Sequence, residues 1–378
     1  MATSSTQDCY VALELSRSKW LVGALLPGRS KITSTLVPGG DTAALLNVLT
    51  RFAARAALDT GSPVALKVCY EAGYDGFWLA RVLIGHGIET HVLDPASFLV
   101  SRRGRRVKTD RIDVEAMVLT LKAFLLGDRS VCRDVIIPSP EQEDARRLSR
   151  ERTQLAAERT RHINRIRGLL ALHGIREVKG LWGGDWSQVL AELRTGDGRE
   201  LGGYLRAEIS REFERLHLVL QHIRALDAER QVALAEEVSP FPQRQKAGAL
   251  IKLAGIGPVT ATTLVAEVFH RRFQSRRHLA SYLGLAPTPY ASGDSKRDQG
   301  ISKAGNQPAR SILVELAWGW LRYQPGSPLT IWYQQTFAGR GQRGRKVGIV
   351  ALARKLAIAL WRYVETGVVP EGAVLSSR

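Results

Sequence analysis

Hydrophobic residues in the first third of the chain occur in short β-branched runs and in stretches with helical spacing. The runs CYVALEL, WLVGALL and KITSTLV predict three strands separated by short turns. A fourth run, PVALKVCYE, predicts a strand that is followed by a helix. The full pattern predicts the order β-β-β-α-β-α-β-α, with elements at 9–15, 20–26, 31–37, 41–58, 63–71, 75–86, 90–95 and 110–126.

The middle of the chain has the pattern of long amphipathic helices. Apolar residues recur within a strongly charged run that starts at Glu141, and a second helix is predicted over 206–237. An insertion that contains Gly and Trp, 177–205, connects the two helices. We expect an antiparallel coiled-coil arm over 141–238 that serves dimerisation. The alternative is two helices that pack inside one subunit.

The last third, 245–378, predicts mainly helices joined by basic loops. ALIKLAGIGPVTATTLVAEV predicts two helices around a GIGP turn, the helix-hairpin-helix pattern. In that pattern Gly255 and Gly257 would let backbone N–H groups approach a phosphate, whereas the alternative is an ordinary helical turn. For Lys303 and Asn306 a structural role in their loop is also open. The nucleic-acid contacts expected from the basic loops are Lys296, Arg297, Lys303, Asn306, Arg343, Arg345 and Lys346.

The net charge of +18 is concentrated in this last third. Residues 1–100 hold 8 basic and 8 acidic residues, and residues 161–240 hold 12 of each. Residues 241–378 hold 20 basic and 6 acidic residues, a net charge of +14. An evenly solvated surface does not segregate charge in this way, so the C-terminal third is predicted to bind a polyanion. Charge alone does not separate DNA from RNA, because both present the same phosphates.

Four carboxylates occupy positions that ordinary solvated residues rarely take. Glu14 lies inside the first predicted strand and Glu71 ends the fourth, where an unpaired buried carboxylate would cost several kcal/mol. Asp110 and Asp113 follow Thr109, a predicted helix N-cap, so both would project from one helical face. Carboxylate oxygens of this kind are the ligands that Mg²⁺ prefers, with Mn²⁺ as a substitute. Paired metals in such a site cut and join phosphodiester bonds.

Features of secreted and membrane proteins are missing from the sequence. It has no run of about 18 apolar residues and no N-terminal secretory signal. Its three cysteines have no metal-ligand spacing, which indicates reduced thiols. We therefore expect a cytoplasmic protein that does not span a membrane.

Two blocks of sequence resemble the DEDD transposases of bacterial insertion sequences, which are relatives of the pilin-gene invertases. The first block holds E-A-G at Glu71 and the string K-T-D-R-I-D. The second holds G-I-G-P-x-T-A, followed by Y-x-G-L-A-P, S-G and I-S-K-x-G-N. The resemblance covers nearly the whole chain, and both blocks in this order are more specific than either alone. It implies a RuvC-like, ribonuclease-H-like metal domain at 1–135, a helical arm, and a mainly helical transposase domain at 245–378.

The resemblance also implies roles for individual residues. Glu14, Glu71, Asp110 and Asp113 take the positions of the metal carboxylates, and Ser292 of the S-G pair takes that of the nucleophile. The family usually has Asp at the first of these positions, and the extra methylene of Glu14 requires the metal geometry to adjust. Two basic residues, Lys108 and Arg111, flank the aspartates. They would either offset phosphate charge near the metals or make general contacts with the nucleic-acid backbone.

The partners implied by the resemblance are nucleic acids and other copies of the chain. Members of the family resemble recombinases guided by a structured RNA of the element itself, the bridge RNA, which pairs with donor and target DNA. The serine of one subunit meets the carboxylates of another, which implies a homo-oligomer, either a dimer or a tetramer. Composition and spacing do not indicate an RNA guide by themselves.

Three functions are open on the sequence. The first is a site-specific DNA recombinase that cuts and rejoins DNA through a phosphoserine link with Mg²⁺. The second is a Mg²⁺-dependent junction-resolving endonuclease that uses water as the nucleophile. The third is a nucleic-acid-binding protein with a decayed active site, which Glu14 in place of Asp would fit. Mg²⁺-dependent strand cleavage separates the third from the other two.

Overall fold

The chain forms two compact units, Met1–Pro138 and Ser139–Arg378. The computed structural model describes residues 7–98, 109–235, 243–292 and 295–376, with the backbone alone at 289–292 and 295–299. Each unit has hydrophobic cores of its own. The finer division into a metal domain, an arm and a transposase domain stays a prediction.

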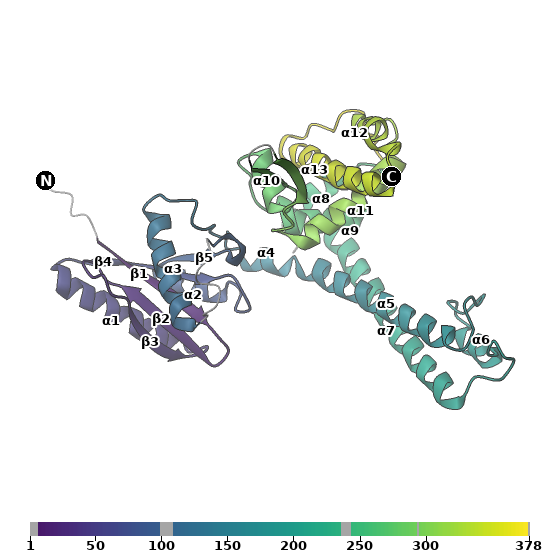
Figure 1. Cartoon of the computed structure of the whole chain (residues 1–378), viewed down its shortest axis with the longest axis horizontal. Coiled ribbons are helices and arrows are strands. Elements are labelled where there is room, and N and C mark those ends of the chain that lie inside the picture. The colour runs from purple at the N-terminus through teal and green to yellow at the C-terminus, as the bar shows by residue number, and fades with distance from the viewer. Residues whose placement is uncertain (1–6, 99–108, 236–242, 293–294, 377–378) are drawn as a thin grey trace. The chain divides into compact units, whose positions relative to one another are not determined.

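The first unit is built on a mixed five-stranded sheet with the order β3-β2-β1-β4-β5 (Figure 1). The central strand β1 pairs antiparallel with β2 and parallel with β4, and β5 extends the parallel half. This unit contains β1 (Gln7–Leu15), β2 (Lys19–Leu25), β3 (Thr33–Pro38), α1 (Thr42–Thr60), β4 (Val64–Glu71), α2 (Trp78–Gly85), β5 (Glu89–Leu93), a 3-10 turn η1 (Pro95–Ser97) and α3 (Asp110–Leu125).

Alternation along β1 decides which helix packs on which face of the sheet. Val11 and Leu13 belong to a core that contains buried residues of α1 and α2. Tyr10 and Ala12 point to the opposite face and belong to a core with the buried residues of α3. The predicted element order is confirmed, and this α/β unit fits a ribonuclease-H-like domain.

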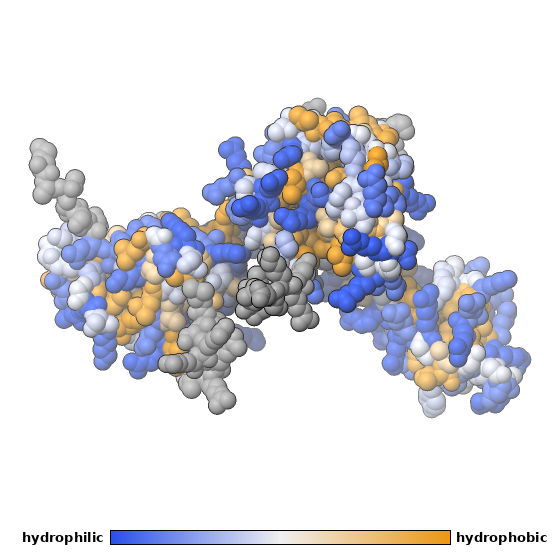
Figure 2. Space-filling model, turned by 45° about the horizontal axis from the view of Figure 1, so that its top comes forward, coloured by the Kyte–Doolittle hydropathy of each residue, from blue (hydrophilic) through white to orange (hydrophobic). Residues whose placement is uncertain are grey.

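Two long helices dominate the first part of the second unit. After the short α4 (Pro140–Asp144), α5 (Arg147–Ala171) runs beside α7 (Gly203–Ala235), with α6 (Trp186–Glu192) in the connection (Figure 1). The pairing is antiparallel, because Leu155 near the start of α5 packs against Leu226 near the end of α7. Hydrophilic residues cover much of the surface of this unit (Figure 2). Coiled-coil geometry and a role in oligomerisation stay predictions.

The rest of the second unit is a helical core with one β-hairpin. The long helix α13 buries Leu352, Leu356 and Leu360 in this core. The elements are α8 (Arg244–Ile251), α9 (Pro258–Leu264), a π-helical turn η2 (Val265–Phe269), α10 (Arg276–Tyr282), β6 (Pro287–Ser292), β7 (Ser295–Ile301), α11 (Gln307–Tyr323), α12 (Pro328–Tyr333), a second π-helical turn η3 (Gln334–Ala338) and α13 (Gln342–Thr366).

Two segments of this core differ from the sequence prediction. The Gly- and Ser-rich segment predicted as a loop contains the antiparallel hairpin β6–β7. The basic segment AGRGQRGRK was predicted as a loop, but α13 begins within it at Gln342. Arg343, Arg345 and Lys346 therefore stand on a helix, which fixes their spacing. None of the helices in the described ranges combines the length and apolarity that crossing a membrane requires.

Candidate active site and nucleic-acid surface

The first two carboxylates stand on neighbouring parallel strands. Leu13 of β1 is in register with Tyr70 of β4, and Glu14 and Glu71 are the next residue on each strand. Side chains alternate along a strand, so Glu14 and Glu71 both follow the direction of Ala12 and Cys69, toward the face that α3 covers. Glu14 is half-buried and Glu71 is exposed. The two carboxylates thus share one face at the carboxyl ends of their strands.

The other two carboxylates open the helix that covers this face. The Thr109 side chain accepts a hydrogen bond from the Ile112 N–H at 3.3 Å, and this cap starts α3 at Asp110. One turn beyond Asp113, the Met117 carbonyl receives the Cys69 thiol at 3.8 Å. Cys69 lies two residues before Glu71, so α3 runs beside the end of β4 that holds this glutamate.

A lysine beside the carboxyl end of β1 shows that α3 begins near the ends of the strands that carry the glutamates. Lys19 begins β2, directly after the turn that follows β1, and its Nζ lies 3.7 Å from Asp110 Oδ2. Arg111 points elsewhere, since its Nε donates to Glu115 Oε1 at 3.0 Å one turn along the helix. Lys108 lies outside the described residues. We call Glu14, Glu71, Asp110 and Asp113 together the carboxylate set.

The carboxylate set suits Mg²⁺ both in the type of its donor atoms and in the places on the backbone from which the side chains start. All its ligands are oxygens, and they come from two adjacent strands and the facing helix. In the described part of the chain, however, no three Asp, Glu, His or Cys side chains are grouped closely enough to hold one ion. Binding of a metal would therefore require these side chains to rotate inward from their present positions.

The predicted nucleophile lies in the second unit, on the hairpin. Ser292 is the last residue of β6, and its backbone is paired with Ser295 at the start of β7. Lys296 and Arg297 follow on β7, opposite Ala291 and Tyr290. Ser292 therefore occupies the end of the hairpin farthest from the helical core, while the carboxylate set belongs to the other unit.

Two glycines fix the base of this hairpin. Gly284 and Gly305 both have positive φ values, +64° and +130°. A Cβ on Gly305 would lie 2.3 Å from the Tyr282 carbonyl oxygen, and one on Gly284 would lie 2.7 Å from the Ala304 oxygen. The Y-x-G-L-A-P and S-K-x-G-N strings thus pack backbone against backbone, which only glycine permits at these two positions.

The GIGP turn between α8 and α9 is also explained by close packing. Gly255 has φ +89°, and a Cβ there would lie 2.8 Å from Tyr323 Cβ. The Gln324 side chain donates to the Ala254 carbonyl at 2.8 Å and so holds the turn against α11. Gly257 has an ordinary φ of −87° and precedes the first residue of α9. A contact of Gly255 and Gly257 with phosphate stays a prediction.

Comparisons with known proteins identify the family of the chain. Residues 247–329 match a family described as "Transposase IS116/IS110/IS902 family", and residues 30–175 match a DEDD model described as "Transposase". The protein y4rJ of Sinorhizobium fredii, named as a transposase, is 47% identical over 379 residues, 97% of this chain and 94% of that protein. The chain belongs to this family of insertion-sequence transposases. The predicted family is confirmed, and the enzyme is a DNA transposase.

More distant relatives cover most of the chain as well. The transposase for insertion sequence element IS1111A of Coxiella burnetii is 28% identical over 303 residues, 79% of this chain and 76% of that protein. The matched range 30–175 contains Glu71, Asp110 and Asp113, whereas Glu14 lies before it. The range 247–329 contains the hairpin with Ser292. These matches assign the family but no residue roles.

Asn306 of the transposase holds its own chain together. Its Oδ1 accepts from the Ala309 N–H at 2.9 Å and so caps α11, while its Nδ2 donates to Glu267 Oε2 at 2.9 Å. Glu267 is fully buried and also receives the Arg150 guanidinium. A contact of Asn306 with nucleic acid stays a prediction, and it would compete with these bonds.

Three of the predicted contact residues line a groove of about 1450 Å³ in the second unit. They are Lys303, after the hairpin, and Arg343 and Lys346 at the start of α13; Arg345 is exposed but not among the lining residues. Sequence reasoning missed the other basic residues of the groove, on α10 and α13. The signal was available, because basic residues recur at helical spacing in the last helix. The missed residues are Arg276, Arg277, Arg354, Lys355 and Arg362.

Proposed function

We propose that this transposase is a site-specific DNA recombinase that moves its own element. Ser292 is the nucleophile, and the carboxylate set holds Mg²⁺, with Mn²⁺ as a substitute. The observation that carries the proposal is the placement of the carboxylates. Glu14 and Glu71 come directly after Leu13 and Tyr70, which are paired across the adjacent strands β1 and β4. The first turn of α3 lies over the same strand ends, as the contacts of Met117 and Asp110 indicate.

The reaction replaces one phosphodiester bond by another. The Ser292 hydroxyl oxygen bonds to the phosphorus while the bond to one DNA oxygen breaks, and the serine proton ends on the hydroxyl of the released strand. Attack by a second DNA hydroxyl on the phosphoserine link reverses the step and joins new partners. Because bond energy is conserved in the link, rejoining needs no ATP.

A serine hydroxyl is a weak nucleophile at neutral pH and needs activation. Bound Mg²⁺ would supply it by polarising the phosphate and favouring the deprotonated hydroxyl. Lys19, whose Nζ lies 3.7 Å from Asp110 Oδ2, would supply positive charge for a DNA phosphate held at this site. The chain thus keeps positive charge beside the scissile phosphate.

The partners in this proposal are donor and target DNA, a structured bridge RNA, and further copies of the chain. The charge of +14 in the last 138 residues supports a large polycationic surface for binding nucleic acid. Ser292 and the carboxylate set belong to different compact units, so one copy can supply the serine and another the carboxylates. A dimer or a tetramer meets that requirement.

A covalent DNA–protein adduct tests the proposal. The protein is expressed with its flanking element DNA, denatured, digested with protease and nuclease, and mapped by mass spectrometry. We expect a nucleotide adduct on the Ser292 peptide that disappears in Ser292→Ala, while Ser295→Ala retains it. Cut DNA ends without any adduct would instead identify water as the nucleophile and a junction-nuclease type of reaction.

A further inference from the structure

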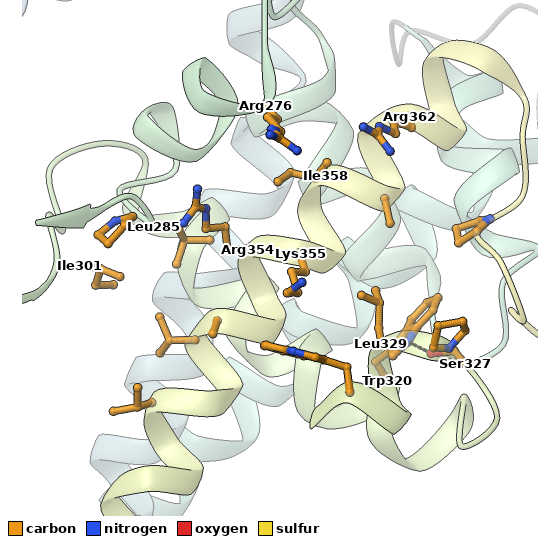
Figure 3. Close-up of a pocket in the computed structure, with 18 of the residues that line it drawn as sticks. Arg276, Leu285, Ile301, Trp320, Ser327, Leu329, Arg354, Lys355, Ile358 and Arg362 are labelled. Carbon is orange, nitrogen blue, oxygen red and sulfur yellow. Dashed lines mark hydrogen bonds between the residues drawn. The ribbon is translucent and has the colours of Figure 1, made fainter. Parts of the chain in front are cut away.

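A large groove runs along α13 in the second unit (Figure 3). One wall comes from α10 and the base of the β6–β7 hairpin, and the other from the start of α12 and the residues after α13. Its volume of about 1450 Å³ exceeds the roughly 300–1,000 Å³ of pockets for small molecules. The shape therefore suits a segment of a polymer.

One face of α13 forms the length of the groove. Lining residues recur every three or four positions from Arg343 to Thr366, which corresponds to a stripe about 35 Å long. The opposite face of α13 is buried in the helical core, through residues such as Leu352 and Leu356. Exposed and partly buried side chains of α13 thus line the groove, although Val350 and Ile358 also pack against the core at its edge.

The groove is strongly positive. Among the lining residues that the structure describes, eight are Arg or Lys and Glu371 is the single acidic one. In the portion of the chain that the structure describes, none of these eight makes an ion pair. Arg276 and Arg362 extend near Ile358 from different elements, and Arg354 lies near Leu285 (Figure 3). Like charges gathered without partners indicate that an anion neutralises them.

Between the cations the floor is apolar. Leu285, Ile301, Val350 and Ile358 line it, and Val347 is 55% exposed. The Lys355 ammonium stands over the Trp332 ring, 4.5 Å from the ring centre. A ligand that matches this surface must combine regularly spaced negative charges with flat apolar groups between them.

We propose that the groove along α13 binds an unpaired polynucleotide strand, with phosphates on the Arg and Lys side chains and bases on the apolar floor. A duplex fits this surface poorly, because its bases are stacked inside and expose only their edges in the grooves, so no base face can lie on the apolar floor. An acidic peptide would meet the charge, but it lacks flat groups at the spacing of the phosphates.

This inference goes beyond the proposed recombination chemistry. It concerns a surface that contains neither Ser292 nor the carboxylate set, and it does not require that Ser292 be the nucleophile. The groove does reach the hairpin base at Pro287, Gly300 and Ile301. A strand that lies along α13 is thereby led toward the hairpin whose far end carries the serine.

Oligonucleotide binding by the full-length protein tests the groove. Fluorescence anisotropy in EDTA, on a Ser292→Ala background, excludes any contribution from cleavage. Single strands of about 12 nucleotides, as DNA and as RNA, are compared with a duplex of the same length. We expect Arg343→Gln/Arg362→Gln to weaken strand binding and to lower its salt slope by about 1.4, since each phosphate contact contributes about 0.7.

A floor variant and a matched control complete the test. Ile358→Asn should weaken strand binding about tenfold with an unchanged salt slope, because it removes apolar contact and no charge. Arg272→Gln/Arg322→Gln removes two exposed charges that do not line the groove, and it should retain strand affinity. The proposal is overturned if this control loses as much affinity as the groove pair. It is equally overturned if the groove pair weakens duplex binding as much as strand binding.

Discussion

Glu267 and Arg150 form a two-point ion pair between η2 and α5. Arg150 Nε donates to Glu267 Oε1 at 2.8 Å, and its Nη2 donates to Oε2 at 3.2 Å. Burial would raise the pKa of Glu267, but the bonds from Arg150 and Asn306 outweigh it and hold that pKa below its ordinary value. The buried carboxylate therefore stays charged and links α5, η2 and the start of α11.

Loss of Arg150 should destabilise the second unit. Arg150→Ala leaves Glu267 charged and buried with Asn306 as its remaining side-chain partner, so we expect unfolding free energy to fall by about 2–3 kcal/mol. Urea unfolding followed by circular dichroism measures the change. Arg147→Ala, an exposed residue at the start of the same helix, is the control. Equal stability of the two variants would contradict a structural role for the pair.

The first unit should lose stability as pH rises through the range in which histidine titrates. The bond from His91 Nδ1 to Asp134 Oδ2, at 2.7 Å, raises the pKa of His91, and burial opposes this only in part. Because the pKa of His91 is higher in the folded state, its protonation stabilises the folded unit, and this stabilisation is complete below the ordinary histidine pKa of about 6.5. The stabilisation is lost as the pH rises through the pKa of His91 in the folded state. Urea midpoints at about pH 6 and pH 8 should differ for the wild type and less so for His91→Gln.

Removal of either aspartate from α3 should stop strand cleavage and spare binding. Asp110→Ala or Asp113→Ala should lower the cleavage rate about a hundredfold or more, because each removes an oxygen from the carboxylate set. Nucleic-acid affinity should change little, since the positive charge lies mainly in the second unit. Gel assays with Mg²⁺ measure both quantities. Asp128→Ala, beyond the end of α3, serves as the control, and near-normal cleavage by Asp113→Ala would remove the metal-site argument.

The close approach at the hairpin base gives a further test. Gly305→Ala should cost well over 2 kcal/mol, because its Cβ would lie 2.3 Å from the Tyr282 carbonyl oxygen in addition to the strain of a positive φ. Gly300 also has a positive φ, +86°, but no atom lies within 4 Å of its Cβ position. Gly300→Ala should therefore cost only about 1 kcal/mol. Thermal unfolding of the two variants separates steric overlap from backbone strain.

The sequence predicted the first unit well because its signals are local. Strand periodicity identified the elements, and the Thr109 cap placed the start of α3, so the positions of Glu71 and Asp113 followed. The β6–β7 hairpin was missed because its strands contain Pro287, Pro289 and consecutive basic residues in place of alternating apolar ones.

Contacts between distant parts of the chain could not be predicted. Arg150 and Glu267 are 117 residues apart, and each alone has the pattern of an ordinary charged residue on a helix. The start of α13 was hidden by its glycines, although Gly348 is required there because a Cβ would lie 2.5 Å from Phe337 Cγ. The roles of Ser292 and the carboxylate set rest on resemblance, and local pattern gave no way to choose Ser292 over Ser295.

The two faces of α13 are under separate constraints. Leu352, Leu356 and Leu360 hold the helical core, whereas Val347, Arg354 and Ile358 face the groove. Substitutions of the exposed groove residues, such as Val347 and Arg343, can alter the groove without changing the leucines of the core behind it. Related elements that acquire different nucleic-acid preferences can therefore diverge along this stripe while the core leucines stay apolar.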